Sequence, residues 1–499
     1  MKKYASAAPF TAALLLIQFA SACGALSGGV TEALTDIPEE TASAAPAAEE
    51  TEAPETDGIP DTDMNGWELS IMSYNENWLT WANTVVGVET ESGDVLDDSI
   101  YRRNAELQER FDFRLSVTNV DTVQSEISKI VSAGDNSYQI YEMNEGGLSG
   151  YLPYISDWAN IGGLRLGESW WNPDATSVYN ISGHQTALAG DVTLSPVSRS
   201  VCMVFNKNVW SSYGDPSVDL YQTVRDNKWT VDSWLSTARS VSADLNGDGQ
   251  MTVDDLYGLN MGRGFKGYIA SFLAGSGMNF TSKVDGADVF TLGENEKALG
   301  LMTRLVDALG ENGFYYNEDA SVHGFAPSDF FKNGHALFTQ GVPHDIYKLR
   351  DMNDDIGMLP MPKYDESQPG FYSAAWGGAV WTLSKTFDLD DADAVRNMGA
   401  VLDAMAWYTE KNIIPIYKEV ALKTKTARDD ESADMLDIVF NSIYFDFGTN
   451  IVYDAVIADT VLAAIWKKKS SDSIVSAIEK NLKKIDKYIA DINEQAAEL

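Results

Sequence analysis

The sequence predicts an α/β protein with parallel-rich sheets flanked by helices and a helical C-terminal region. Strand-like and helix-like segments alternate from Gly66 onward, a comparable mixture occupies Val201 to about Thr339, and the pattern beyond Asp388 is helical. Strands separated by single helices need crossover connections, which produce βαβ units and parallel sheets. The chain has 499 residues and is 44% hydrophobic, so the part after Gly66 is long enough for two hydrophobic cores.

The first elements follow from local patterns. Residues 66–74 (GWELSIMSY), 112–120 (DFRLSVTNV) and 138–143 (YQIYEM) predict strands. Residues 97–111 predict a helix with Asp97 or Asp98 at its N-terminus, and a second helix is expected near Val123–Ala133.

The C-terminal region has the pattern of helices. Residues 390–412 predict one helix. An apolar stripe at helical spacing marks the last helix, and it consists of Ile474, Ile478, Leu482, Ile485 and Ile489.

The N-terminus has the layout of an export signal. Lys2 and Lys3 precede an uncharged run from Tyr4 to Ala22, which ends at Cys23. The residues Ala20-Ser21-Ala22-Cys23 resemble a bacterial lipobox, although that family usually has Leu or Val where Ala20 stands. The resemblance implies that residues 1–22 are a lipoprotein signal peptide and that Cys23 is lipidated, at the extracytoplasmic face of the cell membrane. The alternative is ordinary signal cleavage after Ala22, and both interpretations place the chain outside the cytoplasm.

Residues 23–65 predict a disordered acidic linker. Its composition is dominated by Ala, Thr, Glu, Pro and Asp, and no Lys or Arg occurs between Lys3 and Arg102. Few apolar side chains and one sign of charge cannot offset the entropy of ordering, so the segment is expected to be a self-repelling spacer.

The charge of the whole chain restricts its partners. With 36 basic and 74 acidic residues the formal net charge is -38, which repels phosphate backbones and anionic lipid. We therefore expect no nucleic-acid partner and membrane contact through the lipid anchor only. Besides Cys23, the one other cysteine is Cys202, in an apolar run, where it is expected to be buried.

Residues 244–255 (DLNGDGQMTVDD) match the spacing of a twelve-residue calcium loop. Calcium needs six to eight oxygen ligands, and one loop of this spacing supplies them. Position 12 is an aspartate and not the usual glutamate, so a weak structural Ca²⁺ site is expected. The alternative is a turn rich in Asx residues that needs no metal. The expected ligands are Asp244, Asn246, Asp248, Gln250, Thr252 and Asp255.

Residues 262–267 (GRGFKG) match the short dinucleotide-binding glycine pattern. An extracellular chain has little access to NAD, and no acidic residue stands at a convincing strand end downstream. We interpret the segment as a loop at a helix N-terminus, with Arg263, Phe265 and Tyr268 as candidate ligand contacts.

From Trp158 onward the chain resembles the extracellular solute-binding proteins of family 1, the lipoprotein receptors of bacterial sugar-importing ABC transporters. The segments that carry the resemblance, in order, include WWNPDATSVYNISGHQTALAGDVTLS, MVFNKNVW, FFKNGHALFTQG and DIGMLPMPKYDESQPGFYSAAWGGAVWTLSK. The resemblance implies a two-lobed periplasmic-binding-protein-like fold of type II, with ligand bound between the lobes.

The resemblance also implies domain boundaries. Lobe 1 is expected at 66–193 plus 350–400, lobe 2 at 200–340, and the C-terminal helices of 401–499 are expected to pack mainly on lobe 2. The chain would then cross between the lobes near residues 192–200 and 338–345.

A sugar site needs flat rings for stacking and fixed polar groups around them. Because α/β sheets present ligands at the carboxyl ends of strands, residues that follow predicted strands are the candidates. The candidate ligand-binding residues are Tyr74, Trp78, Trp81, Glu142, Asn144, His344, Trp376 and Gly377, in addition to those of the glycine-rich loop. Core packing is the expectation for Trp170, Trp171, Trp210, Trp229 and Trp234.

Taken together, the residues and the family resemblance favour a non-enzymatic, monomeric receptor, and the resemblance implies that it captures a small solute and delivers it to an ABC transporter permease. The best expectation for the solute is a sugar or short oligosaccharide. Two alternatives stay open: a secreted carbohydrate-active enzyme, since carboxylates are abundant, and a calcium-stabilised adhesion or scaffold protein. No histidine pair, nucleophile elbow or phosphate loop supports another enzyme class.

Overall fold

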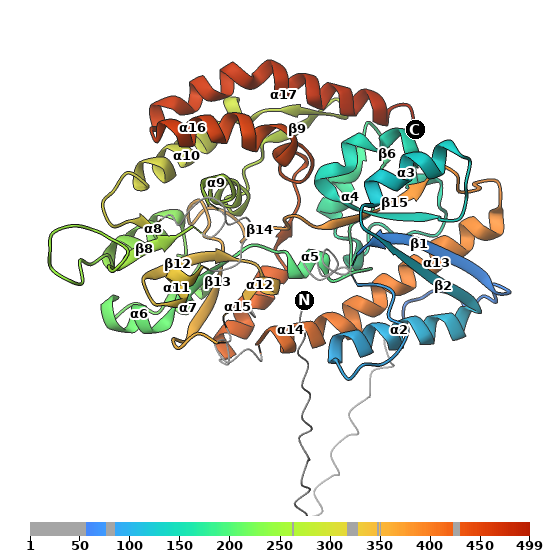
Figure 1. Cartoon of the computed structure of the whole chain (residues 1–499), viewed down its shortest axis with the longest axis horizontal. Helices are drawn as coiled ribbons and strands as arrows, with labels where there is room; N and C mark the ends of the chain where they lie inside the picture. The colour runs from blue at the N-terminus through green and yellow to red at the C-terminus, as the bar shows by residue number, and fades with distance from the viewer. Residues whose placement is uncertain are drawn as a thin grey trace, which may run out of the picture. The chain divides into compact units, whose positions relative to one another are not determined.

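Two five-stranded sheets, each with helices packed against it, organise the chain (Figure 1). The computed structural model describes residues 56–75, 85–261, 264–316, 328–346, 349, 351–422 and 430–499. Residues 56–499 form one compact unit. The predicted signal peptide, Cys23 and nearly all of the predicted linker lie outside the described residues.

The first sheet has the strand order β2-β1-β3-β15-β4. Strand β1 runs parallel to both β2 and β3, whereas β15 is antiparallel to β3 and β4. The three strands predicted from the early sequence are therefore confirmed. The strands are β1 (Trp67–Tyr74), β2 (Phe113–Val120), β3 (Ile140–Asn144), β4 (Ile155–Ser156) and β15 (Ala379–Ser384).

The side chains of β1 contribute to two hydrophobic cores, one on each face of the first sheet. Leu69 and Ile71 belong to a core with Leu107 and Phe111 of α2 (Val95–Phe111), which lies on one face of the sheet. Met72 and Tyr74 belong to the other core, with Val123 and Ile127 of α3 (Val123–Ser132). Because successive side chains of a strand point to opposite faces, α2 and α3 cover opposite sides of the sheet.

Helix α2 begins earlier than predicted. Its N-cap is Asp94, whose carboxylate accepts hydrogen bonds from the amides of Leu96 and Asp97. Asp98 lies in the first turn and accepts from the amides of Ser92 and Gly93. Asp97 and Asp98 both lie in the first turn, at the N-terminus of the helix as predicted, while the cap itself is Asp94, which satisfies the free amides.

The second sheet has the order β11-β8-β12-β7-β13. Strand β7 is antiparallel to both β12 and β13, and β8 is parallel to β11 and β12. The strands are β7 (Cys202–Asn206), β8 (Tyr257–Asn260), β11 (Tyr315–Tyr316), β12 (Ala336–Gly341) and β13 (Ile356–Pro360).

Strand β13 corrects the predicted return of the chain. All five of its residues are buried, and it pairs with β7 from Ile356 to Pro360. Residues 356–360 therefore belong to the second sheet and not to the first, and the chain returns to the first sheet later, through residues 373–378. The ladder with β7 and complete burial place β13 in the second sheet, whereas the family resemblance implied that lobe 1 resumes at about residue 350.

Much of the rest of the described chain is helical. Along the chain between β4 and β12, the longer helices are α4 (Pro173–Tyr179), α6 (Lys207–Tyr213), α8 (Val231–Ser240), α9 (Gly264–Gly275) and α10 (Glu296–Ala308). Short helices α5 (Ser195–Ser198) and α12 (Pro343–Ile346) lie at the ends of the crossing segments. The C-terminal helices are α13 (Ala392–Tyr408), α14 (Ile414–Leu422), α15 (Asp430–Phe440), the π-helix η8 (Gly448–Leu462), α16 (Ala463–Lys468) and α17 (Ile474–Ala496).

The C-terminal helices contact both sheets. Helix α13 packs on α2 and β1, and α15 packs on β13. Helix α17 contacts η8 and both β10 (Ala287–Phe290) and β5 (Asn180–Ile181). Of its predicted apolar stripe, four isoleucines are buried, whereas Leu482 is 38% exposed.

One described helix, Gly448–Lys468, is long and apolar enough to cross a membrane. Two thirds of its apolar window (67%) is buried inside the protein, and its side chains pack against α17 and the short helix η1 (Glu145–Gly150). This is the environment of a core helix.

Candidate functional site at the junction of the two sheets

Three chain segments run side by side where the two sheets meet. Residues 199–201 lead into β7, residues 373–378 lead into β15, and residues 442–446 lead into η8. The amide of Val201 donates to the carbonyl of Ala374 (2.9 Å), and the amide of Ser373 donates to the carbonyl of Ser442 (2.8 Å). The last two segments include the parallel pair β14 (Ser373–Ala374) and β16 (Ile443–Tyr444). These hydrogen bonds make the junction a small, continuous strip of backbone.

A buried carboxylate ties this junction to the end of β3. Glu145 is 4% exposed, and its Oε1 accepts from the amides of Gly377 (2.8 Å) and Gly378 (3.2 Å). Its Oε2 accepts from Nδ2 of Asn450 (2.9 Å) and from the hydroxyl of Tyr179 (3.1 Å). Burial raises the pKa of Glu145 from 4.5 to about 7, because these four donors compensate only part of the lost hydration.

Asp446 is a second buried carboxylate in the same strip. It accepts from the amide and hydroxyl of Thr449 (both 2.9 Å) and from the amide of Phe280 (3.3 Å). Its own amide donates to Oδ1 of Asn450 (3.0 Å). Burial raises the pKa of Asp446 from 3.8 to about 6. Since Asn450 contacts both Glu145 and the backbone of Asp446, the two carboxylates belong to one network.

A buried arginine crosses the strip from the other side. The Arg199 side chain is 0% exposed, and its Nε donates to the carbonyl of Trp376 (3.1 Å). Its Nη1 lies 3.8 Å from Oδ2 of Asp345, which is also buried, in α12. The amide of Trp376 donates back to the carbonyl of Arg199 (3.2 Å). Arg199 therefore links two of the crossing segments to α12.

The structure brings together Tyr74, the last residue of β1, and Asn144, the last residue of β3, whereas Tyr74 and Glu142, which were expected to follow their strands, lie within them. Tyr74 accepts a hydrogen bond from the amide of Asn144 (3.0 Å) and another from Nε2 of Gln124. Glu142 is fully buried and accepts from the hydroxyl of Ser73. Burial raises the pKa of Tyr74 to about 12, so this hydroxyl stays protonated at any ordinary pH.

The predicted residues near the crossings occupy different environments. Trp376 is 2% exposed and packs edge-on against Tyr453, with ring centroids 4.5 Å apart. Gly377 has φ +68° and gives its amide to Glu145, so the close approach expected of the glycine pair is made to a protein carboxylate. His344 lies partly buried in α12, beside α5.

The glycine-rich loop is only partly described. Arg263, Trp78, Trp81 and the side chain of Phe265 lie outside the described part of the chain. Tyr268 is fully buried in α9, against Trp234 and Phe272 in the core of the second sheet.

The predicted calcium loop has an all-oxygen donor set on one tight turn. Asp244 accepts from the amides of Gly247 and Gly249 (both 2.7 Å), and Asp248 accepts from the amide of Gln250 (2.8 Å). Asp255 accepts from the amides of Leu245 (2.9 Å) and Thr252 (2.6 Å) and from the hydroxyl of Thr252 (3.0 Å), and these bonds lower its pKa. Asn246 likewise accepts from the amide of Asp248 (2.9 Å), and among the described residues no three acidic, histidine or cysteine side chains lie close enough together to hold a metal ion.

Sequence reasoning missed the residues that hold the junction together, which are Glu145, Arg199, Asp345, Asp446 and Asn450. Glu145 directly follows the predicted Asn144, so its position after a strand was a usable signal. Asn450 lies 305 positions from Glu145, and no spacing in the sequence relates the two.

Comparison with known proteins identifies the fold. No family model and no curated protein matches the chain. The apo form of RafE from Streptococcus pneumoniae is similar in structure, with 13% identity, 88% of this chain and 99% of that chain covered, and a TM-score of 0.50. The substrate-binding protein Lmo0181 from Listeria monocytogenes, in complex with cycloalternan, has 12% identity, coverages of 87% and 100%, and a TM-score of 0.48. Maltose-bound T. maritima MalE3 has 13% identity, coverages of 84% and 100%, and a TM-score of 0.48. The likeness to RafE confirms the predicted periplasmic-binding-protein-like fold.

Proposed function

We propose that this protein is the substrate-binding component of an ABC importer, and that it captures a sugar or short oligosaccharide between its two sheets. The observation that carries the proposal is the junction itself. Three backbone segments join the two sheets, which share one hydrophobic cluster and each have a further cluster of their own, and strand ends with polar and aromatic side chains meet there. The likeness in fold to RafE is consistent with it.

In this proposal the junction is the hinge. A rotation of one sheet relative to the other changes the backbone torsions of the crossing segments, while Glu145 and Arg199 hold those segments against each other. The solute stabilises the closed arrangement through contacts that it makes to both sides at once. The closed form is then recognised by a membrane permease, and no chemical change of the solute is involved.

A screen of sugars tests the proposal. We expect a mono-, di- or trisaccharide to raise the unfolding temperature, with a stabilisation of about 2.7 kcal/mol at a hundredfold excess over Kd. Small-angle scattering should record a smaller radius of gyration with that sugar. Asn144→Ala should weaken binding, whereas Asn481→Ala, on α17, is the matched control.

The outcome also separates the alternatives. Release of new reducing ends from the bound sugar would identify a carbohydrate-active enzyme. An absence of any small-molecule stabilisation, together with binding of a macromolecule, would identify an adhesion or scaffold protein. Either result would overturn the receptor proposal.

We further propose that Cys23 is acylated and anchors the protein at the extracytoplasmic face of the membrane. The support is the sequence order of basic residues, uncharged run and cysteine. Cys23→Ala should abolish labelling by a fatty acid and release the protein from the membrane fraction. Unchanged membrane retention in that variant would contradict the anchor.

Calcium binding by residues 244–255 is a separate proposal, supported by the oxygen donors of the loop. Ca²⁺ would be held by Asp244, Asn246 and Asp248 with the Gln250 carbonyl, and it would staple the turn. Asp244→Asn should remove the calorimetric signal of CaCl₂ addition, whereas Asp254→Asn, at an exposed non-ligand position of the same loop, should keep it. No heat and no stabilisation by Ca²⁺ in the unmodified protein would favour the metal-free turn.

A further inference from the structure

Strand β2 forms one edge of the first sheet. It pairs with β1 over eight consecutive residues, Phe113 to Val120, without a bulge. The strand at the opposite edge, β4, has two residues, and β13, an edge of the second sheet, is buried and covered by α15. Long, regular edges are normally shortened, bulged or covered, because their free backbone groups invite another strand.

The outer backbone groups of β2 can be assigned from one hydrogen bond. The amide of Leu115 donates to Oε1 of Gln108 (2.8 Å) on α2, so it faces away from β1. Since backbone groups alternate along a strand, those of Val117 and Asn119 face the same way. No residue of the described chain pairs with these outer groups of Val117 and Asn119.

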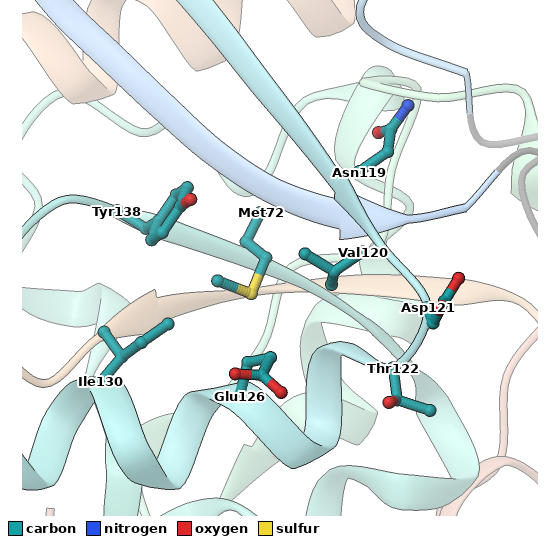
Figure 2. Close-up of a pocket in the computed structure, with 8 residues that line it drawn as sticks. All are labelled: Met72, Asn119, Val120, Asp121, Thr122, Glu126, Ile130 and Tyr138. Carbon is teal, nitrogen blue, oxygen red and sulfur yellow. The ribbon is translucent and has the colours of Figure 1, made fainter.

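A pocket opens on each face of the sheet beside this edge. One has a volume of about 560 Å³ and lies between the sheet and α3. Figure 2 shows Met72 of β1 pointing toward α3, with Glu126 and Ile130 of α3 facing it, whereas the Asn119 side chain points away from α3. The other pocket, of about 400 Å³, lies beside α2 and is lined by residues 87–89, by α2 and by Leu115 to Val117.

The two pockets share a character. Each has apolar walls, such as Met72 and Ile130 in one and Leu115 and Val117 in the other. The charged residues that line them are all acidic, namely Asp121, Glu126 and Glu89. Two basic side chains lie close by in the sequence: Lys129, which pairs with Glu126 at 2.9 Å in a solvated contact, and Arg114, which is exposed on β2 itself.

We propose that β2 is a docking site for an extended, basic segment of another protein, which adds a strand to the first sheet. Main-chain hydrogen bonds to Val117 and Asn119 would hold the segment, and its alternate side chains would enter the two pockets. A lysine or arginine fits these pockets, because its aliphatic stem can lie on the apolar walls while its charge reaches a carboxylate. Pairing with a second copy of this chain is disfavoured by the net charge of -38 on each copy.

The test uses the full-length protein and a blocked heptapeptide in which pairs of lysines alternate with single valines, labelled for fluorescence anisotropy, so that lysines project from both faces of the added strand. Binding is expected, and it should weaken with salt, whereas the glutamate–valine counterpart should not bind. At a peptide concentration of ten times Kd, hydrogen exchange of the Val117 and Asn119 amides should slow about tenfold.

Three variants examine the geometry. Glu126→Lys and Glu89→Lys should each weaken the peptide about fivefold, while Glu498→Lys, an equal charge change at the exposed C-terminus, should not. Val117→Pro should abolish binding with little loss of stability, since its amide is not part of the β1 ladder. Equal binding of the two peptides, no protection at β2, or a dimer in scattering that the peptide does not displace would overturn the proposal.

Discussion

The buried carboxylate of Glu145 makes a specific prediction about pH. Its pKa rises from 4.5 to about 7 in the folded protein, so below pH 4.5 the group is protonated in both the folded and unfolded states. Between pH 4.5 and about 7 the unfolded chain releases a proton that the folded protein keeps. Stability therefore falls as pH rises through this window, and it levels off above the folded pKa.

The magnitude follows from the shift in pKa. One pKa unit corresponds to about 1.4 kcal/mol, so Glu145 alone should lower the free energy of unfolding by about 3 kcal/mol between pH 4.5 and 8. In Glu145→Gln this contribution is absent. The free energy of unfolding of the wild type minus that of the variant should therefore decrease by about 3 kcal/mol over the same range.

Subtracting the variant also removes the contributions of other titrating groups, including Asp446.

At low pH the variant should be the less stable protein. Asn450 donates to the carbonyl of Ala375 (2.9 Å) and accepts from the amide of Asp446, and these two bonds fix the orientation of its side-chain amide. In Glu145→Gln the Nδ2 donor of Asn450 would therefore face the side-chain amide of the glutamine instead of a carboxyl oxygen.

The assay is urea unfolding followed by tryptophan fluorescence at pH 4.5, 6 and 8. Asp446→Asn is a useful second variant, because burial also raises the pKa of Asp446, to about 6, and the same sign of pH dependence applies to it. A wild-type-minus-variant difference for Glu145→Gln that stays constant within about 1 kcal/mol from pH 4.5 to 8 would refute the reasoning.

Three further predictions concern packing. Replacing Arg199 by Met removes a buried cation that donates to the carbonyl of Trp376 and lies 3.8 Å from Asp345, so the free energy of unfolding should fall by about 3 kcal/mol or more; a smaller loss in urea unfolding would show that these contacts are dispensable. Gly258→Ala should destabilise by about 1–3 kcal/mol, since its Cβ would lie 2.3 Å from the carbonyl oxygen of Ala238, whereas Gly300→Ala, in open space on α10, should stabilise by about 0.5–1 kcal/mol; the same sign for both in thermal unfolding would contradict the packing. Burial raises the pKa of Cys202 to about 12, so iodoacetamide should label it at pH 8 only after unfolding, and rapid labelling of the folded protein would show that the thiol is accessible.

The local sequence determined the elements of the first sheet. Alternation of apolar residues in 66–74 and the helical period of 97–111 depend on neighbours only a few positions away, and the observed β1 and α2 match them. The same holds for the packing expected of Trp170, Trp171, Trp229 and Trp234, which are all buried. The carboxyl ends of parallel strands share an edge of the sheet, so the sequence also predicted that Tyr74 and Asn144 lie near each other, and the Asn144 amide donates to the Tyr74 hydroxyl.

Tertiary structure decided where the chain crosses between the sheets and what holds the crossings. Residues 356–360 could have joined either sheet by their hydrophobicity, and only pairing with β7 selects the second. The amides of Gly377 and Gly378 donate to the carboxylate of Glu145, and Asn450, from a helix distant in the sequence, donates to the same carboxylate. Burial of a polar group demands a partner but does not specify where in the sequence that partner lies, so contacts between distant segments are set by the assembled fold.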